Sequence, residues 1–209
     1  DAVFLLVGVL LFRGGAKADA DGVFLPVIMY HSVFEDHSGS YSVSAKTLAS
    51  DLAYLQTNGY HAVLAEDLIA YVYDGKPLPQ KPVMLTFDDG FYNNLSEALP
   101  LLEQYDMKAV ISVVGSFMDK QAGADSHNPA YSYLTMEDIS ALQSSGRVEI
   151  GNHTYAMHGR NGRRGCAKLP QESEPAYAEA LQCDLGKLQT MLTTSVGITP
   201  VVFAYPFGY

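Results

Sequence analysis

The chain has 209 residues, of which 48% are apolar, and its formal net charge is −10. This length and apolar content fit one domain with a substantial core and exclude a disordered chain as the default. The acidic charge argues against nucleic acid as the main partner, because a phosphate backbone needs a basic face. Cys166 and Cys183 fit neither a CxxC redox pair nor a zinc-finger spacing, so both a disulfide and two free thiols stay open.

An apolar run covers residues 3–12 and is followed by Arg13 and small residues. It is shorter than the roughly 20 residues that span a bilayer as a helix, but it matches the apolar part of a secretory signal. The alternative is a first buried strand or helix of the fold. We expect residues 1–22 to be a signal or membrane-anchor remnant with a linker, and residues 23–209 to be the catalytic domain. This predicts an extracellular or cell-surface protein, with membrane anchoring through the N-terminus as one form.

Predicted strands and helices alternate along the rest of the chain. The strands are short apolar runs bounded by turn residues, at 23–31, 60–64, 83–87, 108–114, 147–150 and 199–204. The helices carry apolar residues at helical spacing, at 44–57, 65–73, 94–105, 135–143 and 175–192. Residues 34–44 and 115–132 are expected to be loops. This alternation predicts an α/β fold with a parallel sheet, either open or closed into a barrel.

Local signals set several of these helix boundaries. Ser44 is a predicted N-cap, and Thr135 with Asp138 forms a capping-box pattern. Pro100 falls inside the third predicted helix and predicts a kink or a restart there.

Two adjacent carboxylates, Asp88 and Asp89, end the central predicted strand and are followed by Gly90. Like charges at the end of a buried strand are costly, because repulsion and desolvation both oppose ionisation. A cation relieves that cost, as does a division of labour in which one carboxylate binds a metal and the other acts as a base. The alternative is an ordinary surface turn, since Asp and Gly favour turns.

Histidines also follow predicted strands. His31 ends the first strand, and His153 follows the strand at 147–150. The carboxyl ends of parallel strands form the edge that carries the active site in α/β folds. His158 lies five residues after His153, a spacing at which neither a regular helix nor a strand lets both rings bind one ion. An irregular segment allows it; otherwise the two histidines are unrelated.

One carboxylate and two imidazoles form a three-ligand set for Zn²⁺ or a similar ion, which leaves a position open for water. The second carboxylate is then free to act as a general base.

Three motifs in this order, Thr86–Gly90, His153–His158 and Tyr205–Gly208, resemble the first three motifs of the polysaccharide deacetylases, the NodB-homology or carbohydrate esterase family 4 enzymes. The resemblance covers about residues 26–209. It implies a deformed (β/α) barrel, and whether the barrel is complete or incomplete at the C-terminus stays open. It also implies metal-dependent removal of N-acetyl groups from an amino-sugar polysaccharide, which is peptidoglycan, poly-N-acetylglucosamine or a chitin-like polymer.

The resemblance also implies roles for single residues. Asp88 is expected to be the general base, and the metal is expected to be Zn²⁺, with Ni²⁺, Co²⁺ and Fe²⁺ as alternatives. The expected metal ligands are Asp89, His153 and His158, and the expected substrate-binding residues are Tyr205, Pro206 and Phe207.

The chain departs from the family pattern in three places. Its histidines are five apart where many members have four, which is similar to the branch that acts on poly-N-acetylglucosamine. Ala204 stands where many members have an arginine that orients the base, and the late motifs that supply the general acid do not occur. Residues 26–31 are similar to the opening of that same branch, where the barrel is circularly permuted, which implies His31 as the general acid.

Other functions stay open on the sequence alone. An O-acetyl esterase on xylan or another glycan would use the same site. A catalytically decayed carbohydrate-binding domain would fit the missing arginine and late motifs. A glycosidase fits less well, because adjacent carboxylates rarely reach the separation needed on both sides of a glycosidic bond.

Overall fold

The computed structural model describes residues 4–5, 22–122, 127–159 and 162–208. Its strands are β1 (Phe4–Leu5), β2 (Val27–Tyr30), β3 (Ser32–Phe34), β4 (Ser42–Ser44), β5 (His61–Ala62), β6 (Pro82–Phe87), β7 (Ala109–Val113) and β8 (Val148–Asn152). Its α-helices are α1 (Ala45–Thr57), α2 (Ala65–Asp74), α3 (Leu99–Gln104), α4 (Gly115–Gln121), α5 (Met136–Ser144) and α6 (Glu174–Val196). A π-helical turn, Asn94–Ala98, precedes α3, and a 3-10 turn, Pro206–Gly208, ends the described chain.

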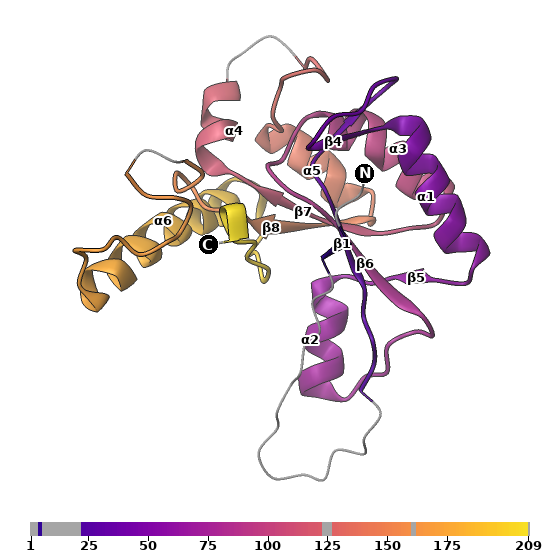
Figure 1. Cartoon of the computed structure of the whole chain (residues 1–209), viewed down its shortest axis with the longest axis horizontal. Helices are drawn as coiled ribbons and strands as arrows, with labels where there is room; N and C mark the ends of the chain where they lie inside the picture. Colours follow the sequence, from indigo (N-terminus) through magenta and orange to yellow (C-terminus); the bar gives the residue numbers. More distant parts are fainter. Residues whose placement is uncertain (1–3, 6–21, 123–126, 160–161, 209) are drawn as a thin grey trace.

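The central sheet has the order β1-β2-β6-β7-β8, and β5 pairs with the start of β6 (Figure 1). Every pair in it is parallel except β1 with β2. The predicted α/β fold with a mostly parallel sheet is therefore confirmed. The strand order is open among the described residues, so closure into a deformed barrel stays a prediction.

The two faces of the sheet carry separate apolar clusters, because successive side chains of a strand point to opposite faces. Val83, Leu85 and Phe87 pack with the apolar faces of α1, α3, α5 and α6 in the larger core. Met84 instead packs with Leu64 of the segment that leads into α2, on the other face. In Figure 1, α2 accordingly lies apart from the other helices.

The predicted helix signals operate as expected. The Ser44 hydroxyl accepts the Thr47 N–H at the start of α1. Thr135 and Asp138 form a reciprocal capping box at the start of α5. Pro100 lies in the first turn of α3, after the π-helical turn, so the helix restarts there as predicted.

Three predictions of local structure are wrong. Residues 115–132, expected to be a loop, contain α4, whose seven residues are too few to show a helical period. The loop expected at 34–44 contains β4. The strand expected at 199–204 is reduced to a single bridge between Phe203 and Asn152.

The two cysteines are free thiols, with Cys166 buried and Cys183 exposed. Most of the predicted N-terminal signal or anchor, residues 1–3 and 6–21, lies outside the described residues; Phe4–Leu5 pair with β2. Among the described helices, none is both long enough and apolar enough to cross a lipid bilayer.

Gly90 is required by the turn that ends β6, for two separate reasons. Its φ is +70°, in the left-handed region that side chains with a Cβ disfavour. A Cβ at this position would also lie 2.9 Å from Cγ1 of Val113 in β7. Gly75, which ends α2, has a similar φ of +69° but open space around it.

Gly90→Ala should therefore lower the free energy of unfolding more than Gly75→Ala does. We expect about 1–2 kcal/mol for Gly75→Ala from the backbone alone, and about 1–3 kcal/mol more for Gly90→Ala from the clash with β7. Urea unfolding followed by circular dichroism measures both values. Equal losses in the two variants would contradict the close packing of this turn on β7.

Candidate metal centre and active site

The turn after β6 holds both carboxylates at the carboxyl edge of the sheet. The Asp88 N–H donates to the Tyr30 carbonyl at 3.0 Å, which ties the turn to β2. Asp89 has a φ of +74°, so it and Gly90 are consecutive left-handed residues. Aspartate is one of the few residues other than glycine that accept this conformation. The chain thus turns sharply at the first residues after the strand.

His153 and His158 lie on an irregular segment after β8, as the spacing required. Thr154 has a φ of +75°, which breaks the strand immediately after His153. The Asp184 carboxylate on α6 accepts the N–H groups of Tyr155 and Ala156, at 2.7 and 2.9 Å. The segment between the two histidines is therefore held in a fixed, non-repeating shape.

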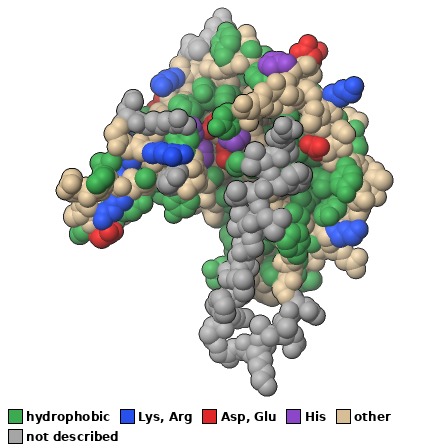
Figure 2. Space-filling model, in the orientation of Figure 1, with side chains coloured by type: hydrophobic (Ala, Val, Ile, Leu, Met, Phe, Trp, Pro, Cys, Tyr) green, Lys and Arg blue, Asp and Glu red, His purple; other side chains and the backbone are tan. Residues whose placement is uncertain are grey.

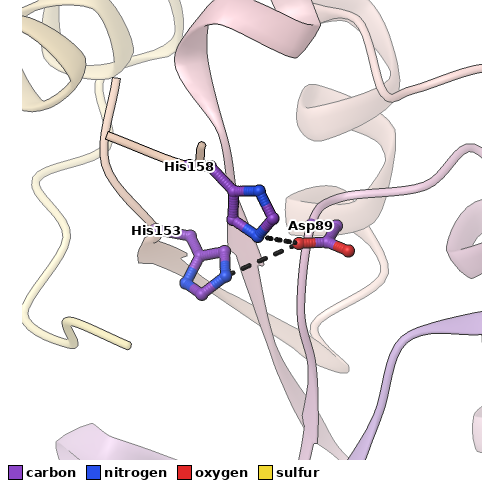
Figure 3. A group of neighbouring side chains, drawn as sticks. All are labelled: Asp89, His153 and His158. Carbon is purple, nitrogen blue, oxygen red and sulfur yellow. Dashed lines mark ion pairs between the residues drawn. The ribbon is translucent and has the colours of Figure 1, made fainter. Parts of the chain in front are cut away.

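This shape brings both rings to the Asp89 carboxylate (Figure 3). Oδ1 of Asp89 lies 3.0 Å from Nε2 of His158 and 3.5 Å from Nε2 of His153. One ligand atom from each of the three residues lies within 4.8 Å of the others. No other group of three His, Cys, Asp or Glu residues converges in this way within the part of the chain that the structure describes.

The residues present fit a metal ion. Nδ1 of His153 lies 2.8 Å from the Ala204 carbonyl oxygen, which only accepts, so Nδ1 carries the proton and Nε2 presents its lone pair to Asp89 in the neutral ring. Oδ1 of Asp89 is buried and accepts no hydrogen bond from the described residues. Acceptors that face one another in this way need a cation between them, either a proton on the imidazole or a metal ion.

The two carboxylates differ in their environments. Asp88 is only 8% exposed, and burial raises its pKa, although the charges of His153 and His31 oppose the shift. Burial also acts to raise the pKa of Asp89, but its contacts with His153 and His158 outweigh this and hold the pKa well below the usual range. The lowered pKa keeps Asp89 ionised, as a metal ligand must be. Asp88, whose pKa is raised, takes up a proton more readily than Asp89 does.

His31 reaches the same site through the strand register. Tyr30 in β2 pairs with Phe87 in β6, so the next residues, His31 and Asp88, leave the sheet at one level. The positive charge of His31 acts to lower the pKa of both carboxyls.

Two buried asparagines hold the backbone around His31, and the sequence interpretation did not single them out. Nδ2 of Asn94 donates to the His31 carbonyl at 2.8 Å. Asn93 donates to the Ser32 hydroxyl at 2.7 Å and accepts the Val33 N–H at 3.0 Å. The signal in the sequence was the pair of adjacent amide side chains at the start of the third predicted helix.

The three predicted substrate-binding residues, Tyr205, Pro206 and Phe207, differ in their distance from the histidines and in their exposure. The Phe207 ring centre is 4.8 Å from that of His158, and Pro206 is buried beneath the turn. Tyr205 is 55% exposed and packs on Phe203, with ring centres 4.5 Å apart. The structure therefore places the Phe207 ring against His158, whereas the Tyr205 ring packs against Phe203.

Comparison with known proteins agrees with this site. The polysaccharide deacetylase family model matches residues 75–209. The poly-β-1,6-N-acetyl-D-glucosamine N-deacetylase of Escherichia coli K12 is 29% identical over 203 residues, which cover 87% of this chain and 30% of that protein. The chain thus spans under a third of the length of this curated relative.

Solved structures show the same similarity. A de-N-acetylase from Aggregatibacter actinomycetemcomitans is 26% identical and has a TM-score of 0.75, over 88% of this chain and 80% of that one. IcaB from Ammonifex degensii is 28% identical with a TM-score of 0.72, over 88% and 75%. Because the family model matches more than half of its residues, the chain belongs to the polysaccharide deacetylase family.

Proposed function

We propose that this chain is a metal-dependent hydrolase that removes N-acetyl groups from a poly-N-acetylglucosamine type of polysaccharide. The observation that carries the proposal is the convergence of one oxygen of Asp89 with Nε2 of both His153 and His158, beside the buried carboxyl of Asp88. The similarity to an enzyme named for poly-β-1,6-N-acetyl-D-glucosamine favours this polymer over peptidoglycan or chitin.

The ion would be held by Asp89, His153 and His158, and Zn²⁺ suits one carboxylate with two imidazoles. A bound divalent ion supplies a Lewis acid that polarises the acetyl carbonyl and lowers the pKa of water. The hydrogen bond from His153 to the Ala204 carbonyl sets the tautomer that such a ligand needs.

Asp88 acts as the general base in this proposal. It accepts a proton from water as the water oxygen attacks the acetyl carbon, and burial raises its pKa in the direction that suits this task. His31 donates a proton to the amine nitrogen as the carbon–nitrogen bond breaks. The products are acetate and a glucosamine unit. Phe207, which contacts His158, lies on the turn that we assign to the substrate side.

Removing one ligand should remove the metal. We expect purified protein to hold about one Zn²⁺ per chain, and His158→Ala to lose it, because two remaining ligands bind far more weakly than three. His37→Ala is the matched control, since His37 is 62% exposed and outside the site. Metal content after dialysis, measured by mass spectrometry, checks this. Equal metal content in both variants would contradict the assigned ligand set.

Replacing the proposed base, Asp88, should slow the reaction strongly and leave the metal bound. We expect Asp88→Asn to lower kcat for acetate release from β-1,6-linked N-acetylglucosamine oligomers by about 10²–10⁴-fold. Asp36→Asn, at a 91% exposed side chain, should have no effect. Acetate release from acetylxylan but from no N-acetylglucosamine oligomer would instead make the chain an O-acetyl esterase.

We also propose that the protein acts outside the cytoplasm, at the cell surface or beyond it. The apolar run at residues 3–12 supports this, because it resembles the apolar region of a secretory signal. Fractionation of cells that express the chain with and without residues 1–22 tests it. The shortened chain should stay in the cytoplasm, and an unchanged distribution would refute the proposal.

A further inference from the structure

We propose that Phe91, Phe117 and Tyr133 form a stacking subsite for the sugar ring next to the one being deacetylated. We call these three residues the aromatic shelf. The inference rests on the proposed function, because it assumes that the substrate is a polysaccharide chain that passes the metal centre.

The Tyr133 ring contacts both other rings, although the three residues come from different segments of the chain. Tyr133 stacks on Phe91, with ring centres 5.0 Å apart and planes 23° apart. Its ring centre also lies 4.6 Å from that of Phe117 on α4. All three residues are half-buried, so their rings are supported by the protein and still reach solvent.

The shelf is built on the same turn that holds the two carboxylates. Leu134 donates its N–H to the Gly90 carbonyl at 2.9 Å, and Tyr92 donates to the Ser132 carbonyl at 2.8 Å. These bonds flank the backbone bridge between Phe91 and Tyr133. Because the rings are already held, little conformational entropy is lost when a ligand binds to them.

The shelf also adjoins the metal centre directly. The Phe117 ring centre lies 5.4 Å from that of His158. Burial raises the pKa of the Tyr133 hydroxyl, and the negative charge of Asp89 raises it further. Figure 2 shows green hydrophobic side chains beside purple and red ones near the middle of the face. The shelf is therefore an apolar surface next to the position at which the acetyl group would lie.

The chemistry of the shelf suits a neutral sugar ring. All the large substituents of β-linked N-acetylglucosamine are equatorial, so both faces of the ring present C–H groups. These groups are attracted to the negative face of an aromatic ring, and a flat surface gives them a large contact area. Lys120 lies 5.5 Å from the centre of the Phe117 ring. Tyr133 stacks on Phe91, and Lys120 lies over Phe117, so we assign the sugar contact mainly to the face of Phe91 that points away from Tyr133.

Tyr133→Leu tests the shelf, because it keeps an apolar side chain and removes the ring on which Phe91 is stacked. The rates to compare are those for a β-1,6-linked N-acetylglucosamine pentamer and for 4-nitrophenyl acetate, which has no neighbouring sugar. We expect kcat/KM for the pentamer to fall about tenfold more than that for the small ester, mainly through KM. Tyr133→Phe keeps the ring and should restore the pentamer rate to within about threefold.

Tyr131→Leu is the matched control, because Tyr131 lies in the same loop, is 63% exposed and is not in the shelf. It should leave the ratio of the two rates unchanged. Equal losses on both substrates in Tyr133→Leu, or no loss on the pentamer, would overturn the shelf. Loss of pentamer activity in Tyr133→Phe would also overturn it, by assigning the effect to the hydroxyl group.

Calorimetric titration of the pentamer separates this inference from the proposed function. If the wild-type chain releases no acetate but binds the pentamer, and Tyr133→Leu weakens that binding about tenfold, the deacetylase proposal fails and the shelf stands. If the wild-type chain releases acetate but Tyr133→Leu binds the pentamer as tightly as wild type, the shelf fails alone.

Discussion

Negative charge at the carboxyl edge of β6 is the constraint on which the site depends. Asp88 is buried and Asp89 is nearly so, and two adjacent carboxylates away from water repel one another unless positive charge is supplied. Histidines stand where they can supply positive charge: His153 and His158 contact Asp89, and His31 follows β2 at the level of Asp88. In the proposed function, a metal ion held by Asp89, His153 and His158 would complete the same balance.

The supports of this site come from distant parts of the chain. Asp184 on α6 holds the segment between His153 and His158, and the Ala204 carbonyl orients His153. Many family members carry an arginine at the position of Ala204. In this chain the backbone carbonyl of Ala204 contacts His153, one of the proposed ligands. A substitution of the Ala204 side chain leaves this carbonyl in the chain. The histidines around Asp88 meanwhile act on its charge directly.

Local signals predicted much of the fold, because caps and apolar periods act over a few residues. Ser44, Thr135 and Pro100 set helix boundaries where they were expected. The helix α4 escaped prediction because its single short run shows no period, and it matters because it carries Phe117. The expected strand at 199–204 failed because one apolar run does not reveal whether the backbone finds a partner along its whole length.

The sequence by itself determined which residue types were available for chemistry and that they follow strands: Asp88, Asp89, His31, His153 and His158. Motif order was sufficient for this, since parallel strands bring their carboxyl ends to one edge. Only the tertiary structure decided that three candidate ligand atoms converge, and that Asn94 and Asp184 hold the backbone around His31 and after His153. The physical reason is that these contacts depend on strand register and on left-handed turns at Asp89 and Thr154. Register and turn geometry are fixed by packing between elements far apart in the chain, which no local pattern encodes.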